Sequence, residues 1–191
     1  MKSMSYAVAI LSLILPGLAI AHTGVGETAG FVHGLAHPLG GIDHLLAMIA
    51  VGIWAAQMGG RALWIVPTTF VTVMVLGGVL ATNVAMPLVE AGILISILVL
   101  GGLIAGAFRF SVVISSLLVG LFALFHGFAH GAEMPTSISA VSYAFGFGLT
   151  TALLHLLGIG FGHWIHKINL SILNRVAGSV IAMSGLYLVI A

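Results

Sequence analysis

The sequence contains no cysteine, and it has only five Lys or Arg and four Asp or Glu among 191 residues. The lack of cysteine excludes disulfides, thiolate metal sites and iron–sulfur clusters. Charged residues make up 5% of the chain and hydrophobic residues 61%, whereas soluble domains carry roughly 25% charged residues. Such a chain cannot cover its surface with polar groups, so the composition predicts a protein embedded in a lipid bilayer.

Two enzyme motifs are also missing. The H-E-x-x-H motif of membrane metalloproteases is absent, because His126 is followed by Gly-Phe-Ala-His. The nucleotide-binding motif G-x-x-x-x-G-K-[ST] is absent too, which argues against an ATP-driven pump. We therefore expect no enzyme, and no catalytic residue is assigned. Two alternatives stay open: an intramembrane metal-dependent hydrolase with scattered ligands, and a membrane protein that relays protons through His and Asp.

The N-terminus has the pattern of a secretory signal peptide over residues 1–21. Lys2 supplies the positive charge, residues 6–15 form a short apolar run, and residues 19–21 read Ala-Ile-Ala, an A-x-A cleavage site. Cleavage would leave His22 as the mature N-terminus on the outer side of the membrane. An uncleaved first helix is the alternative.

Residues 22–191 are predicted to form a single all-helical transmembrane domain. Six apolar segments follow one another with short connections, each near the roughly 20 residues needed to cross a bilayer. We place them at about residues 31–57, 62–81, 88–108, 110–132, 139–165 and 170–190. Small residues at helix-contact spacing, Gly102-x-x-x-Gly106 and Gly158-x-x-x-Gly162, predict close backbone packing.

The few charges fall on two sides of this predicted bundle. With the mature N-terminus outside, one side holds Arg61, Arg109, Lys167 and Arg175, and the other holds Glu27, Glu90 and Glu133. Basic residues gather on the cytoplasmic side of membrane proteins. The pattern therefore predicts a multi-pass protein of the bacterial cytoplasmic (inner) membrane with its N-terminus in the periplasm.

Polar residues interrupt the first apolar segment at residues 33–44, HGLAHPLGGIDH. On a straight helix, His33 and His44 would lie roughly 16 Å apart, too far to share one ion. Pro38 and the following glycines weaken the helix, and a break there would bring His37 towards Asp43 and His44. Ionisable residues inside a membrane are costly and are candidates for function, although an Asp–His pair that merely locks two helices is the structural alternative.

A second polar group, HGFAHGAE at residues 126–133, lies near the outer end of the fourth apolar segment. His126 and His130 are four residues apart, so they share a helix face and can chelate one metal. We predict that His126 and His130 face the first motif at a similar depth and complete a site with His37, Asp43 and His44. The outer pathway would use His22, His33 and Glu133, and the inner pathway His155.

The chemistry of these ligands narrows the choice of ion. Imidazole and carboxylate without thiolate suit Ni²⁺, Co²⁺, Zn²⁺ or Cu²⁺ more than Cu⁺. Nothing in the composition chooses among these four metals. Their order of affinity alone would favour Cu²⁺, so geometry and availability must supply selectivity.

The two motifs resemble those of the HupE/UreJ family. The resemblance rests on HPLGGIDH at residues 37–44, VGIW at 51–54, HGFAHGAE at 126–133 and LLH at 153–155, and it extends over essentially the whole chain. Members of this family are regarded as nickel or cobalt permeases, often associated with nickel hydrogenase or urease systems in bacteria. A different nickel and cobalt permease family uses H-x-x-x-x-D-H, one residue shorter than the spacing here, so its geometry is not transferred.

The resemblance implies secondary import of Ni²⁺ or Co²⁺ as a transported substrate, with no permanently bound cofactor. It also implies that His37, Asp43 and His44 are critical for transport, followed by His126, His130 and Glu133. The expected surroundings are the lipid bilayer, with no nucleic-acid partner and with a functional link to hydrogenase or urease maturation. The sequence leaves the oligomeric state open, a homo-oligomer included.

Overall fold

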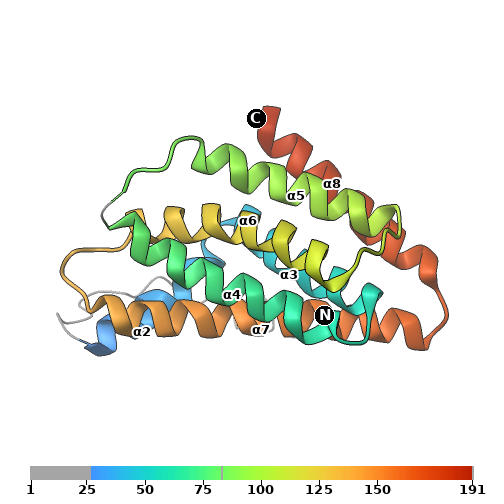
Figure 1. The fold of residues 1–191 in the computed structure, drawn as a ribbon, viewed down its shortest axis with the longest axis horizontal. Coiled ribbons are helices and arrows are strands. Elements are labelled where there is room, and N and C mark those ends of the chain that lie inside the picture. The colour runs from blue at the N-terminus through green and yellow to red at the C-terminus, as the bar shows by residue number, and fades with distance from the viewer. Residues whose placement is uncertain (1–26, 83, 191) are drawn as a thin grey trace, which may run out of the picture.

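The structure, a computed structural model, describes residues 27–82 and 84–190. Within those residues the chain is helical throughout, and turns connect the helices (Figure 1). In chain order the elements are α2 (Glu27–Ala36), the short 3₁₀ helix η1 (His37–Leu39), α3 (Ile42–Met58), α4 (Ala62–Ala81), α5 (Val89–Ala105), α6 (Val112–Ala132), α7 (Ala140–Lys167) and α8 (Ser171–Ile190).

Five of the six predicted segments correspond to one helix each, α4 to α8, and their ends differ by at most a few residues. The first segment, predicted at 31–57, is instead divided into α2, η1 and α3. The predicted signal peptide at 1–21 and His22 lie outside the described residues. The boundaries agree because apolar length and turn residues determine both hydropathy and helix ends.

Four described helices, α4, α6, α7 and α8, are long and apolar enough to cross a bilayer, and the bent pair α2–α3 makes five if it counts as one span. Helix α5 is equally apolar but has only 17 residues, the lower limit for a transmembrane helix. The chain is therefore a multi-pass membrane protein by length and composition. A sixth span requires α5 to cross the bilayer as well.

The first predicted helix bends by 81° between α2 and α3. Pro38 lies at the start of η1, and the Gly40 N–H donates to the His37 carbonyl oxygen at 3.0 Å, closing a tight turn. Gly41 then adopts an extended conformation before α3 begins. A Cβ atom on Gly41 would collide with the Asp43 carboxylate and lie 2.9 Å from Nδ1 of His44. The break predicted from Pro38 and the glycines is confirmed, and glycine at 41 leaves room for the Asp43–His44 pair.

Glycine also sets the contacts between neighbouring helices. Helix α3 packs against α7 where Gly52 faces Gly158, and a Cβ atom on either glycine would collide with the other helix's backbone. Helix α4 packs against α6 in the same way at Gly77 and Gly127. Such contacts supply the van der Waals packing that holds membrane helices together.

In α5 the glycine that makes the close helix contact is Gly101, and not Gly102 as the Gly102-x-x-x-Gly106 spacing predicted. Gly101 packs against the α8 backbone at Gly178 and Ala182, whereas Gly102 has no atom within 4 Å of a Cβ placed on it. The close contact between α5 and α8 therefore depends on Gly101. Spacing alone could not select the contacting glycine, because adjacent helix positions differ by about 100° in direction.

The two ends of the bundle differ in charge. The α3–α4, α5–α6 and α7–α8 turns lie at one end, on the right in Figure 1, and Arg61, Arg109 and Lys167 lie in or beside them. Helices α2 and η1 and the C-terminal end of α6 lie at the opposite end. We refer to these as the basic end and the histidine end.

Candidate metal site

A cavity of about 470 Å³ opens at the histidine end, where the break between η1 and α3 faces the end of α6. Its wall contains Asp43 and Glu133 and four of the histidines, His33, His37, His44 and His130. The broken helix contributes most of these groups, because His33, His37, Asp43 and His44 lie on either side of the 81° bend. Irregular backbone at membrane depth is tolerated where it lines such a cavity.

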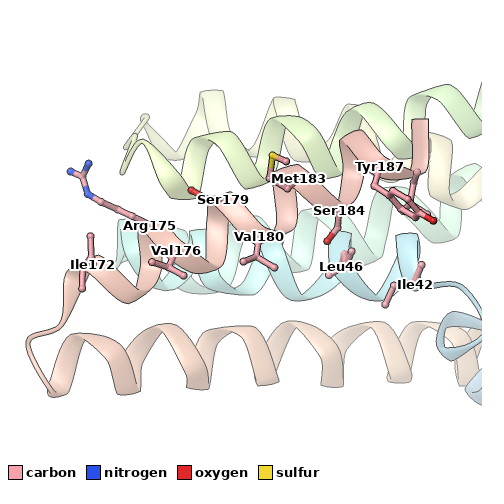
Figure 2. A pocket seen from close by; sticks show the side chains of 11 residues that line it. Ile42, Leu46, Ile172, Arg175, Val176, Ser179, Val180, Met183, Ser184 and Tyr187 are labelled. Carbon is pink, nitrogen blue, oxygen red and sulfur yellow. The ribbon is translucent and has the colours of Figure 1, made fainter. Parts of the chain in front are cut away.

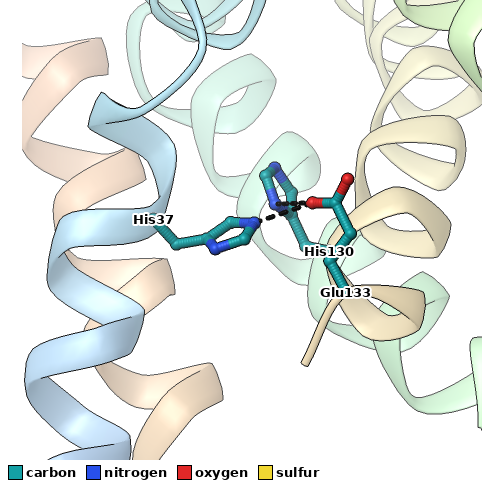
Figure 3. A group of neighbouring side chains, drawn as sticks. All are labelled: His37, His130 and Glu133. Atoms are coloured by element: carbon teal, nitrogen blue, oxygen red, sulfur yellow. Dashed lines mark hydrogen bonds and ion pairs between the residues drawn. The ribbon is translucent and has the colours of Figure 1, made fainter. Parts of the chain in front are cut away.

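Three of the side chains that line this cavity meet: His37 from η1, His130 from α6, and Glu133 at the C-terminal end of α6 (Figure 3). Nε2 of His37 lies 2.8 Å from Oε2 of Glu133, and Nδ1 of His130 lies 4.0 Å from the same oxygen. One ligand atom from each residue lies within 4.8 Å of the other two. This spacing fits the roughly 2.0–2.2 Å bonds that nitrogen and oxygen ligands make to a central divalent ion.

His44 extends the group inwards. Its ring centroid lies 4.3 Å from that of His130, and its Nδ1 atom lies 2.8 Å from Oδ1 of Asp43. The backbone N–H of His44 donates to the same oxygen at 2.9 Å. Nε2 of His44 is buried and has no hydrogen-bond partner. With Nδ1–H donating to Asp43, the Nε2 lone pair is free to bind a metal.

Two further histidines continue this line into the bundle. His126 is fully buried, its Nδ1 donates to the Phe122 carbonyl at 2.9 Å, and its ring lies 5.2 Å from that of His44. Phe70 follows, with ring-centroid distances of 5.3 Å to His126 and 5.1 Å to His155. Nε2 of His126 and both ring nitrogens of His155 are buried without a partner. Buried polar atoms are normally paired, so these nitrogens are available for a ligand.

The predicted site residues differ in how closely they approach one another. His37, His130 and Glu133 meet directly, and His44 and Asp43 adjoin them. The two motifs face one another as predicted: the ring of His130 contacts those of His37 and His44, and the ring of His126 contacts that of His44. His33 lies on the exposed wall of the same cavity, and His155 lies beyond Phe70.

Aromatic residues that the motifs did not indicate contact these histidines from neighbouring helices. Tyr143 and Phe147 of α7 contact the ring of His37, with centroids at 5.7 and 6.5 Å, and Phe147 lies 4.1 Å from the His130 ring. Phe70 lies in the middle of α4, which has no polar motif. The sequence did not single out these residues, because a buried aromatic residue beside a ligand looks like any other core residue.

The donor set defines the chemistry that this cavity can support. Two imidazoles and one carboxylate provide borderline ligands for Ni²⁺, Co²⁺ or Zn²⁺. His44 offers a further nitrogen within one ring contact of His130. The cavity can therefore accept a divalent ion at its mouth and offer it another imidazole at each deeper position.

Comparison with known proteins agrees with these motifs. The model of the family described as HupE / UreJ protein matches residues 9–188. The chain belongs to the HupE/UreJ family. Protein HupE of Rhizobium leguminosarum bv. viciae is 41% identical over 191 residues, which cover all of both chains. No solved structure matches this HupE/UreJ chain.

Proposed function

We propose that this HupE/UreJ protein is a secondary transporter that imports a divalent transition-metal ion, Ni²⁺ or Co²⁺, through the histidine-lined cavity. The observation that carries the proposal is the cluster of His37, His130 and Glu133, continued inwards by buried imidazoles with unpartnered nitrogens. A structural metal would need one site in which protein ligands fill every coordination position. Ligands that follow one another into the bundle instead support an ion that moves from site to site.

The proposed route starts at the histidine end. His33, and His22 if the signal peptide is cleaved, would capture the ion, and His37, His130 and Glu133 would bind it first. His44, oriented by Asp43, and then His126 would receive it. His155 would be the last ligand, on the far side of Phe70.

The direction of transport follows from the charge of the two ends. The basic end would face the cytoplasm of a bacterial inner membrane, and the histidine end the periplasm. An inside-negative potential favours inward movement of a divalent cation by about 4.6 kcal/mol per 100 mV, twice the value for one charge. Import would therefore need no nucleotide. Through the nickel it delivers, the protein would support maturation of a nickel hydrogenase or urease.

The test is metal uptake into proteoliposomes loaded with a metal-sensitive dye. Wild-type protein would be compared with the triple variant His37→Ala/His130→Ala/Glu133→Gln across Ni²⁺, Co²⁺, Zn²⁺, Cu²⁺ and Mn²⁺. We expect uptake of Ni²⁺ or Co²⁺ driven by an imposed inside-negative potential, and its loss in the variant. Uptake that is equal in wild-type and variant vesicles would contradict the assignment of the site.

One observation supports a second function. Two histidines and one glutamate beside an open cavity are also the ligands of hydrolytic zinc sites. The same vesicles would be supplied with Zn²⁺ and assayed for hydrolysis of lipid and peptide substrates. Hydrolysis without metal flux would favour the hydrolase, and proton flux without metal flux would favour a proton relay.

A further inference from the structure

The basic end holds a second polar cavity, remote from the histidines of the proposed transport site. It has a volume of about 300 Å³ and lies where the end of α3 meets the α5–α6 and α7–α8 turns. Arg109, His166 and Arg175 line it together with the amides of Gln57 and Asn174. None of its lining residues is an acid. Among the described residues, no ion pair involves either arginine.

The amide side chains of this cavity lack partners as well. Gln57 is only 9% exposed, yet neither its Nε2 nor its Oε1 atom has a hydrogen-bond partner. The Oδ1 atom of Asn174 is likewise buried and unpaired. An unpaired buried polar group costs about 1–3 kcal/mol. Unpaired amides beside two unneutralised guanidinium groups are the surroundings that a phosphate group with its bound water would satisfy.

An apolar groove begins at the same arginine. Arg175 also lines a cavity of about 730 Å³ between α3 and α8. Figure 2 shows Ile172, Val176 and Val180 following one another along α8, with Arg175 near the α7–α8 turn. The groove continues to Tyr187, about 18 Å along the helix from Arg175. That length exceeds the roughly 15 Å of hydrocarbon in one leaflet.

We propose that this pair of cavities binds an anionic phospholipid of the leaflet at the basic end. Its phosphate group lies at Arg109 and Arg175, beside the amide of Gln57, and one acyl chain lies along Val176 and Val180. A free anion would occupy the polar cavity but would leave the apolar groove without a ligand. A lipid without negative charge would leave both arginines unneutralised. Basic pockets between membrane helices on the cytoplasmic side recognise anionic headgroups in this way.

The experiment uses the full chain purified in a mild detergent, with bound lipid counted by native mass spectrometry. The protein is offered an equimolar mixture of phosphatidylglycerol and phosphatidylcholine with identical acyl chains, and separately inorganic phosphate. We expect retention of one phosphatidylglycerol in preference to phosphatidylcholine. Each arginine replaced in Arg109→Gln and Arg175→Gln should lower this preference about fivefold, the ratio that corresponds to about 1 kcal/mol per basic residue.

Two matched variants test the parts of the site. Arg61→Gln removes a basic residue at the same end that does not line either cavity, and it should keep the preference. Val180→Trp fills the groove without changing charge, and it should lower retention of both lipids. Equal retention of the two lipids by the wild-type protein would overturn the proposal. Inorganic phosphate that displaces phosphatidylglycerol completely, or a lipid-free dimer that Val180→Trp dissociates, would overturn it too.

Discussion

Nε2 of His37 and Oε2 of Glu133 lie 2.8 Å apart, although 96 residues separate them in the chain. The contact joins the break after α2 to the end of α6, so it closes the mouth of the metal cavity from two sides. Glu133 is also the residue that brings His130 into the same group, through the 4.0 Å approach of Nδ1. Glu133, which was predicted to rank behind His37, Asp43 and His44, is thus part of the cluster itself.

We expect Glu133→Gln to weaken Ni²⁺ binding at least about tenfold, because the amide keeps the size of the carboxylate but loses the charge that binds the metal. Isothermal titration of the purified protein would measure the dissociation constant. Glu90→Gln is the matched control, since Glu90 is an exposed carboxylate that does not line the cavity. Equal weakening in both variants would indicate a general electrostatic effect and contradict a role of Glu133 as ligand.

Asp43 is expected to act through His44 rather than as the principal ligand, because its Oδ1 atom already accepts from the His44 ring and backbone. Asp43→Asn should weaken metal binding by about 10- to 100-fold, as loss of a carboxylate that orients a histidine does. A double-mutant cycle with His44→Ala separates the two roles. In the His44→Ala background, Asp43→Asn should change the dissociation constant little.

One outcome of this double-mutant cycle would contradict the proposed role of Asp43. If Asp43→Asn weakens binding by the same factor with and without His44, the carboxylate binds the metal itself. His33→Ala is a useful reference in this series, because His33 is an exposed residue of the cavity wall and, among the described residues, forms no hydrogen bond with Asp43 or His44. A smaller effect of His33→Ala than of Asp43→Asn is expected.

The helices and the break at Pro38 could be predicted from the sequence because hydropathy, proline and glycine act locally. The histidine set could be predicted because buried imidazoles and carboxylates are costly in a membrane. The direct contact of Glu133 with His37 could not be predicted, since it depends on how the end of α6 is rotated towards η1. Phe70 could not be predicted at all, because only packing places an apolar ring between His126 and His155.

Gly158→Ala should destabilise the protein, because the added methyl would collide with the carbonyl of Ile49 and approach Gly52. Overpacking of this kind costs about 1–3 kcal/mol. Thermal unfolding in detergent would detect it as a lower midpoint temperature. Gly102→Ala is the control, since a Cβ there meets no atom within 4 Å. If both substitutions lower the midpoint equally, the close contact of α3 and α7 does not limit stability.

Phe70→Leu should speed passage of the ion between His126 and His155, because the fully buried ring lies between these two histidines. A barrier lowered by about 1 kcal/mol would raise the initial rate at saturating metal about fivefold. Stopped-flow fluorescence of proteoliposomes would measure this rate, and a pH-sensitive dye would measure an accompanying proton leak. Phe128→Leu is the control, because Phe128 is also buried, in α6, and its ring contacts no histidine ring among the described residues. A rate unchanged or lowered by Phe70→Leu in well-folded protein would contradict a barrier at this ring.

Uptake should fall when the outer pH is lowered from 7.5 to 5.5 at a fixed membrane potential. Metal binds the neutral imidazole, and imidazoles in water take up a proton near pH 6.5. Lower pH therefore removes ligands, so the sign is a loss of uptake on acidification. Any imidazole of the cluster must be neutral to bind the ion together with Glu133. His163→Gln alters an exposed histidine near the basic end, and it should leave the profile unchanged. A rise in uptake on acidification would instead indicate that protons drive the metal inwards, and it would replace potential-driven import by proton symport.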